Sequence, residues 1–134
     1  MADKIGVLGE ATTATAATTT AYTVASGKGA KAQIMWKGLA HASNSSGDFE
    51  ILVNGIVVAN RLNMPAGEYF YSNNITLIHD PSASTEPDGS TPTLTCAPAP
   101  QIFWLSAGDT VQYTIGTDAM QEIHFQVVGV EVDV

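Results

Sequence analysis

The residues of this chain that could bind a metal ion are few and widely separated. The three histidines, His41, His79 and His124, lie on different segments, and none has a second histidine or a cysteine at ligand spacing. Cys96 is the only cysteine, so an internal disulfide or a thiolate cluster for zinc or iron–sulfur is excluded. No histidine lies near Cys96 in sequence to activate its thiol, which favours a structural role over a nucleophilic one. We therefore expect no metal and no other cofactor.

Acidic residues gather in a long segment, residues 80–100, that is rich in Pro, Ser and Thr. Asp80, Glu86 and Asp88 carry the oxygen ligands that calcium takes on a flexible loop, but their spacing matches no calcium-binding loop. The simpler interpretation is that they keep the loop solvated. A loop of this length inside one domain is usually functional, interfacial or mobile, so we predict that it contacts something outside the fold.

No sequence pattern typical of a catalytic site is present. No serine stands in a Gly-x-Ser-x-Gly turn, which argues against a serine hydrolase. The aromatic residues Trp36, Trp104, Tyr69 and Tyr71 could line a sugar-binding face, although such residues more often belong to a core or a subunit interface. We expect a protein that is not an enzyme, with a carbohydrate-binding module as one alternative.

Composition limits the class of protein further. The chain has 134 residues, of which 45% are hydrophobic and 13% charged, as in one packed globular domain. Its net charge is −8, and no segment gathers Lys or Arg, so direct binding to nucleic acid or to an anionic membrane is disfavoured. The start of the chain lacks the apolar run of a secretory signal, so we expect synthesis and retention in a cytoplasm unless the protein leaves within a larger particle.

The first 21 residues differ in composition from the remainder. A short apolar piece, residues 5–9, precedes a Thr/Ala tract over residues 11–21. Such a tract buries too little apolar surface to fold alone, yet β-branched threonines suit an edge strand beside a neighbour. We predict an extended N-terminal arm over residues 1–21 that becomes ordered on contact, followed by a single domain over residues 22–134.

Alternation of side chains predicts the first long strand of that domain, over residues 30–37. Ala32, Ile34 and Trp36 share one face, and the longer polar or flexible side chains share the other. This pattern indicates a strand with one buried face.

Asn54-Gly55 between two apolar runs is the strongest hairpin signal in the sequence, because a type I′ turn needs positive φ at both central positions. The predicted register places Val53 opposite Ile56 and Ile51 opposite Val58 on the core side. The other side then carries Leu52 opposite Val57 and Glu50 opposite Ala59. Leu52 and Val57 leave an apolar spot that another strand or subunit would cover.

The last strand changes phase. Ile123, Phe125 and Val127 lie on odd positions, whereas residues 130, 132 and 134 are valines on even positions, so we predict a β-bulge at Gly129. About eight strands are indicated and no convincing helix. The predicted fold class is therefore all-β, an antiparallel β-sandwich of the jelly-roll kind.

Two short segments resemble a known group of proteins. Residues 22–28 read Tyr-Thr-Val-Ala-Ser-Gly-Lys after a Thr-rich lead, and residues 105–109 read Leu-Ser-Ala-Gly-Asp before the closing strands. They resemble the "Tyr-Thr-Val-Pro-Ala-Gly-Lys" and "Leu-x-Ala-Gly-Asp" turns of head-decoration (cement) proteins and related head or tail accessory proteins of tailed bacteriophages. Here Ala-Ser-Gly stands in place of Pro-Ala-Gly.

This resemblance implies a jelly-roll subunit that binds the major capsid protein on the outside of an icosahedral shell. It also implies a virion location, synthesis in the host cytoplasm and a homo-oligomer, with a trimer favoured. A tail, neck or fibre-base component is the alternative within the same group. The residues expected at the assembly interface are Ile5, Val7, Leu8, Tyr22, Leu52, Val57 and Trp104.

Overall fold

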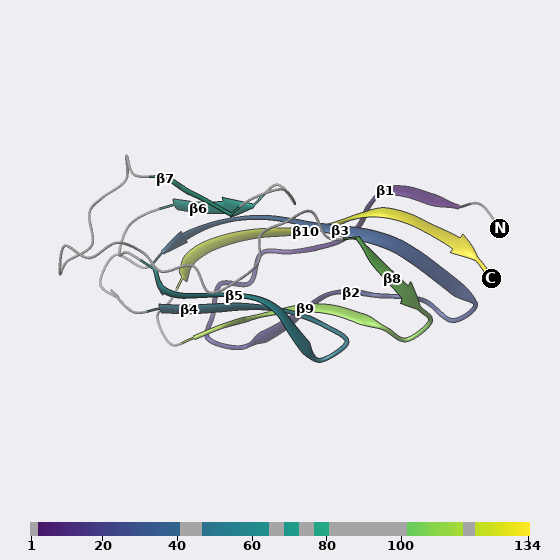
Figure 1. Cartoon of the computed structure of the whole chain (residues 1–134), viewed down its shortest axis with the longest axis horizontal. Helices are drawn as coiled ribbons and strands as arrows, with labels where there is room; N and C mark the ends of the chain where they lie inside the picture. Colours follow the sequence, from purple (N-terminus) through teal and green to yellow (C-terminus); the bar gives the residue numbers. More distant parts are fainter. Residues whose placement is uncertain (1–2, 41–46, 65–68, 73–76, 81–101, 117–119) are drawn as a thin grey trace.

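Two antiparallel sheets packed face to face make up the protein (Figure 1). The computed structural model describes residues 3–40, 47–64, 69–72, 77–80, 102–116 and 120–134, and these residues contain ten strands and no helix. The predicted antiparallel β-sandwich is confirmed.

The larger sheet has the order β1-β10-β3-β6-β7, with β8 also paired to β3. The smaller sheet has the order β2-β9-β4-β5. The strands of the larger sheet are β1 (Lys4–Ala11), β3 (Lys28–Ala40), β6 (Tyr69–Ser72), β7 (Leu77–Asp80), β8 (Phe103–Ser106) and β10 (Met120–Asp133). Those of the smaller sheet are β2 (Thr18–Thr23), β4 (Gly47–Val53), β5 (Ile56–Met64) and β9 (Thr110–Ile115).

The N-terminal segment belongs to the sandwich. β1 pairs with β10 and β2 pairs with β9, so the boundary expected between residues 21 and 22 falls inside a strand. The Thr/Ala connection between β1 and β2 is held by the Tyr113 hydroxyl, which donates to the carbonyl of Thr13 at 2.8 Å. The Ile115 N–H donates to the carbonyl of Ala17 at 3.1 Å. These long-range bonds order a tract that could not fold alone.

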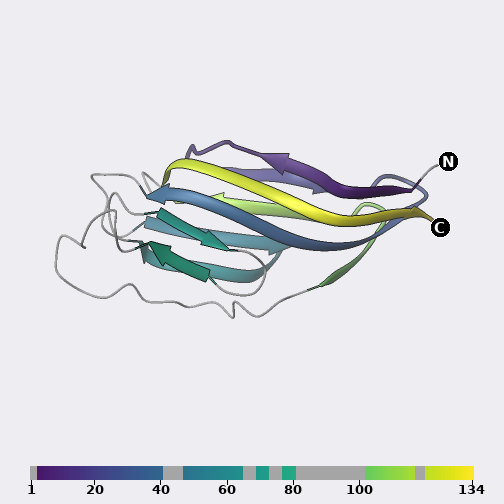
Figure 2. The ribbon, with the colours of Figure 1, turned by 90° about the horizontal axis from the view of Figure 1, so that it is seen from above.

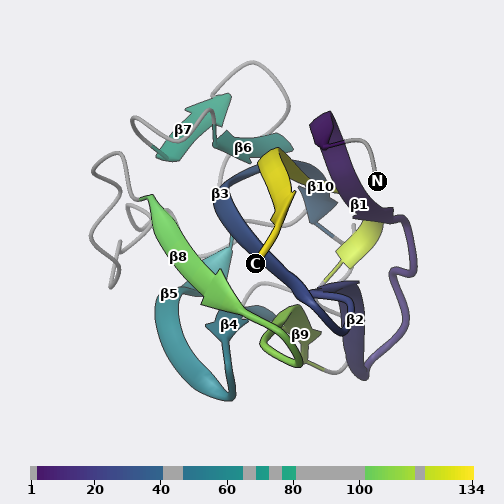
Figure 3. The same cartoon turned by 90° about the vertical axis from the view of Figure 1, so that its right-hand side faces the viewer.

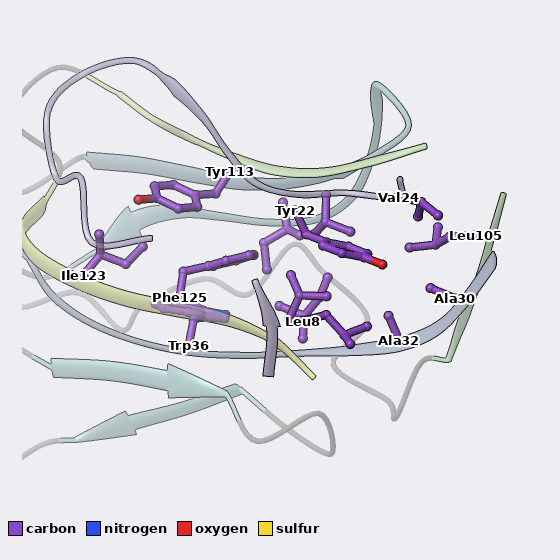
Figure 4. Packing of buried hydrophobic residues seen from close by; sticks show 14 of the residues in the cluster. Leu8, Tyr22, Val24, Ala30, Ala32, Trp36, Leu105, Tyr113, Ile123 and Phe125 are labelled. Carbon is purple, nitrogen blue, oxygen red and sulfur yellow. The ribbon is translucent and has the colours of Figure 1, made fainter. Parts of the chain in front are cut away.

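Alternation in β3 builds one side of the core as predicted. Ala32, Ile34 and Trp36 are buried, and the side chains between them point to the outer face. Aromatic rings then cross from sheet to sheet. Measured between ring centroids, Trp36 lies 4.4 Å from Phe49, and Tyr113 lies 5.9 Å from Phe49 and 4.8 Å from Phe125. Figure 4 shows Trp36, Tyr113 and Phe125 within this core.

The hairpin turn also forms as predicted, but its register changes within the strands. Asn54 and Gly55 have φ of 55° and 79°, as a type I′ turn requires, and Val53 pairs with Ile56 and Leu52 with Val57. Beyond these pairs an irregularity shifts the register, so Ile51 pairs with Ala59. Glu50 pairs with Asn60. The predicted pairs of Ile51 with Val58 and of Glu50 with Ala59 are wrong, because Val58 is an extra residue on β5.

The bulge predicted at Gly129 is wrong. β10 pairs with β3 without a register shift there, and the shift opposite this strand lies in β1, between Val7 and Gly9. Gly129 is required for another reason: a Cβ at this position would lie 2.0 Å from the carbonyl oxygen of Lys31. The apolar positions change from odd to even because β10 is continuous and its later valines, Val130 and Val132, lie on the outer face of the sheet.

β1 and β2, each at an edge of its sheet, meet on one side of the sandwich (Figure 3). Register shifts occur at Leu8 in β1 and at Ala21 in β2. A Cβ on Gly9 would lie 2.2 Å from the carbonyl oxygen of Ala21 and 2.9 Å from the Cβ of Tyr22. Only glycine permits this close approach of the backbones.

Candidate assembly surface

An apolar patch covers the outer face of the larger sheet, the face seen in Figure 2. Residues paired across neighbouring strands point to the same side, so the register gives the composition of this face. One row across four strands reads Ile5, Val130, Lys31 and Trp104. On one side of it, the next row holds Val7, Val128 and Gln33, and the row after that holds Met35. On the other side, Val132 lies opposite Gly29. We call the apolar members the outer-face patch: Ile5, Val7, Met35, Trp104, Val128, Val130 and Val132.

Trp104 is the most exposed large ring among the described residues, with 76% of its surface accessible. The Lys31 ammonium lies 5.1 Å from the centroid of the Trp104 ring, within the range of a cation–π interaction. This contact places the Lys31 ammonium beside β8.

The outer face of the smaller sheet has a different character. Thr18 and Thr114 are hydrogen-bonded between their hydroxyls at 2.7 Å, and Gln112 donates to the Thr20 hydroxyl at 2.9 Å. These pairs satisfy one another across β2 and β9, which makes that half of the face polar. The apolar spot expected there is present only as half-buried Leu52 and exposed Val57.

The predicted interface residues therefore divide into three groups. Ile5, Val7 and Trp104 come together on the outer-face patch, whereas Leu52 and Val57 lie on the opposite sheet. Leu8 and Tyr22 are core residues and are removed from the surface set. Leu8 turns inward at the β1 bulge, and Tyr22 turns inward after the shift in β2.

Sequence reasoning missed most of the central members of the patch, above all Val128 and Val130 in β10. The signal was present in the phase change after Val127, which was interpreted as a bulge. Without a bulge, the same valines must point away from the core, and they then continue the row that Ile5 begins.

The two turns noted in the sequence lie side by side at one end of the sandwich. The Val24 N–H donates to the carbonyl of Asp109 at 3.0 Å, and the Gly108 N–H donates to the carbonyl of Val24 at 2.9 Å. Within the second turn, a carboxylate oxygen of Asp109 accepts from the Ser106 N–H at 2.8 Å. We call residues 24–28 and 106–109 the turn cluster. It joins the smaller sheet to the larger one.

Two polar side-chain contacts tie the end of β10 to the end of β2 and to this cluster. The Tyr22 hydroxyl donates to the carboxylate of Glu131, and the Lys28 ammonium, itself buried, pairs with Asp133. Burial, together with the hydrogen bond and the charge of Glu131, raises the pKa of Tyr22 above its ordinary value. The hydrogen bond from Lys28 lowers the pKa of Asp133. The Val134 N–H adds a bond to the carbonyl of Gly27 at 3.0 Å.

The residues considered for metal chemistry form no site in the part of the chain that the structure describes. No group of three or more His, Cys, Asp or Glu there could hold a metal ion, and the Nε2 atom of His124 lies 2.8 Å from the Oε1 atom of Glu122. His41, Glu86, Asp88 and Cys96 lie outside the described residues, as does nearly all of the 80–100 loop.

Of the four aromatic residues considered for sugar binding, only Trp36 and Trp104 have side chains that the structure describes. Trp36 is in the core and Trp104 is on the outer face, although both stand in the larger sheet. Tyr69 and Tyr71 are described only by the backbone of β6.

Among the described residues there is no helix with the length and apolar character needed to cross a membrane. No known protein family, no curated protein and no solved structure matches this chain.

Proposed function

We propose that this chain is a non-enzymatic virion protein that decorates and stabilises the outer surface of a tailed-bacteriophage capsid. Its partner would be the major capsid protein, and its action would be to bind neighbouring capsid subunits. The resemblance in the two turn motifs favours a trimeric assembly for such a protein.

The observation that carries the proposal is the contact between those two motifs. Their central residues are more than 80 positions apart in sequence, yet the backbone bonds between Val24, Gly108 and Asp109 join them into the turn cluster. Two short matching segments that contact each other in the fold support a common structural origin with the decoration proteins. Two matching segments at unrelated places would support it less.

The strand order supports the jelly-roll assignment. In a jelly roll the first and last strands are neighbours in one sheet, and the second and second-last strands are neighbours in the other. β1 lies beside β10 and β2 beside β9, with β3 and β4 next to these pairs. This architecture is compatible with a shell protein but is also used by many unrelated proteins, so function must be tested on the particle.

Quantitative mass spectrometry of purified particles of the encoding phage tests the location. A copy number comparable to that of the major capsid protein supports decoration of the shell. A copy number that is a small fraction of it supports the tail, neck or fibre-base alternative, and absence from particles contradicts both.

A binding experiment tests the turn cluster. Ala107 is exposed on the second turn, so Ala107→Arg adds bulk there without entering the core. We expect this variant to lose cosedimentation with undecorated capsids, whereas Thr12→Arg, on the exposed β1–β2 connection, keeps it. Equal binding by both variants would remove the turn cluster from the capsid interface.

Truncation of residues 1–21 is not a clean test of shell binding. It would remove β1, cut β2 and take Leu8 out of the core. Loss of binding by such a variant would report damage to both sheets, so substitutions are preferable.

A further inference from the structure

The outer-face patch is one continuous apolar surface rather than a set of scattered residues. Ile5 is 79% exposed, Val7 43%, Met35 40% and Trp104 76%, and the half-buried valines of β10 join them into one surface. With large side chains presenting about 150–250 Å² each, the exposed apolar area is on the order of 600 Å². This reaches the upper end of the range of roughly 300–600 Å² for the largest patch on a monomer.

Negative charge is also scarce within the patch. The chain carries a net charge of −8, so most faces of two copies repel each other. Among the described residues in the rows from Val132 to Val128, Lys31 is the only charged residue on the outer face, and it is held over Trp104. The row of Met35 adds one acidic residue, Glu10, whose carboxylate accepts a hydrogen bond from Gln126 at 3.5 Å.

We infer that a second copy of this chain covers the outer-face patch with its own outer-face patch, larger sheet against larger sheet. Sheets of a sandwich pack about 10 Å apart with side chains of both faces interdigitated, and this geometry suits Ile5, Val130 and Trp104. The apolar area approaches the roughly 800 Å² per partner that a stable interface of standard size buries.

A contact between identical patches is isologous and closes as a pair of copies. The inference therefore differs from the trimer that the sequence resemblance favours. It concerns association between copies and holds whether or not the protein binds a capsid.

Sedimentation velocity over a series of protein concentrations tests the inference. We expect the wild-type chain to form a dimer, and the double variant Ile5→Lys with Trp104→Ser to raise the dissociation constant by more than about tenfold. Both substituted side chains are exposed, so circular dichroism should show an unchanged fold. Ile56→Lys is the matched control, because Ile56 is 68% exposed on the smaller sheet.

Fluorescence gives an independent readout. Trp36 is buried in the monomer, whereas Trp104 is open to solvent, so acrylamide should quench mainly Trp104. We expect quenching to fall as the wild-type concentration rises and the patch becomes covered. The double variant lacks this tryptophan and should show no such dependence.

Three results would overturn the inference: a monomer at every concentration, a double variant that associates as well as wild type, or equal weakening by Ile56→Lys. A monomer whose double variant loses capsid binding would assign the patch to the shell. A dimer that is absent from phage particles would contradict the proposed function and leave the dimer standing, so the two failures are distinguishable.

Discussion

The phenolic hydroxyl of Tyr22 donates a hydrogen bond to the carboxylate of Glu131, which joins β2 of one sheet to β10 of the other. The two residues are more than 100 positions apart, and Tyr22 is buried. A hydrogen bond to a charged acceptor in such a place stabilises the pairing of the two sheets at this end of the sandwich.

Tyr22→Phe should lower the free energy of unfolding by about 1–3 kcal/mol, because it leaves the Glu131 carboxylate without its donor. Urea denaturation of wild type and variant measures this difference. Glu131→Gln retains an acceptor oxygen and should cost less. A Tyr22→Phe variant as stable as wild type would show that this bond contributes nothing net.

The raised pKa of Tyr22 predicts a loss of stability in alkali. The folded state holds the phenolic proton more tightly, so the contribution is complete below the ordinary pKa of about 10 and decreases as the pH rises above it. Urea denaturation at increasing pH should show a steeper decline for wild type than for Tyr22→Phe. Parallel declines would contradict the assignment.

The ion pair between Lys28 and Asp133 predicts a loss of stability as the pH falls in the acid range. Its lowered pKa makes Asp133 stabilising above the ordinary value of about 3.9, and the contribution is lost as the pH falls through the folded-state pKa. The difference in melting temperature between wild type and Asp133→Asn should therefore disappear in strong acid. In a Lys28→Met background, Asp133→Asn should have a smaller pH-dependent effect, because the largest cause of the lowered pKa of Asp133 is gone.

Gly9→Ala should be strongly destabilising, by about 1–3 kcal/mol or more, because the new Cβ meets the backbone carbonyl of Ala21. Thermal unfolding measures the effect. Ala11→Gly, at the end of the same strand, is the control for general backbone effects and should cost less. An unchanged melting temperature for Gly9→Ala would show that β1 and β2 can separate freely.

Gly55→Ala should cost about 1 kcal/mol, since alanine is strained at the φ of 79° that the hairpin turn requires. Asn54→Gly keeps positive φ accessible at the first turn position and should be closer to neutral. Urea denaturation of both variants separates the turn effect from loss of side chains. Equal stability of Gly55→Ala and wild type would contradict the type I′ assignment.

Local patterns in the sequence were sufficient for the elements that depend on neighbours along the chain. Alternation placed Ala32, Ile34 and Trp36 in the core, and Asn54-Gly55 located a hairpin whose first two pairs are correct. These features follow from side-chain periodicity and turn stereochemistry alone.

Features that depend on distant strands were not accessible in the same way. The burial of Leu8 requires a bulge opposite β10, and the extra residue Val58 on β5 follows no local signal. The outer-face patch assembles Ile5, Val130 and Trp104 from three strands, so its existence depends on the strand order. The candidate surface was therefore predicted only in part.

The pairing of the first strand with the last also determines when the sandwich can form. Lys4 pairs with Glu131 and Thr23 with Thr110, so β1 and β2 wait for partners that are synthesised many residues later. Contacts between residues so far apart in sequence make folding slow compared with that of a helical domain of similar size. Until β10 leaves the ribosome, the apolar residues of β1 stay exposed to other nascent chains.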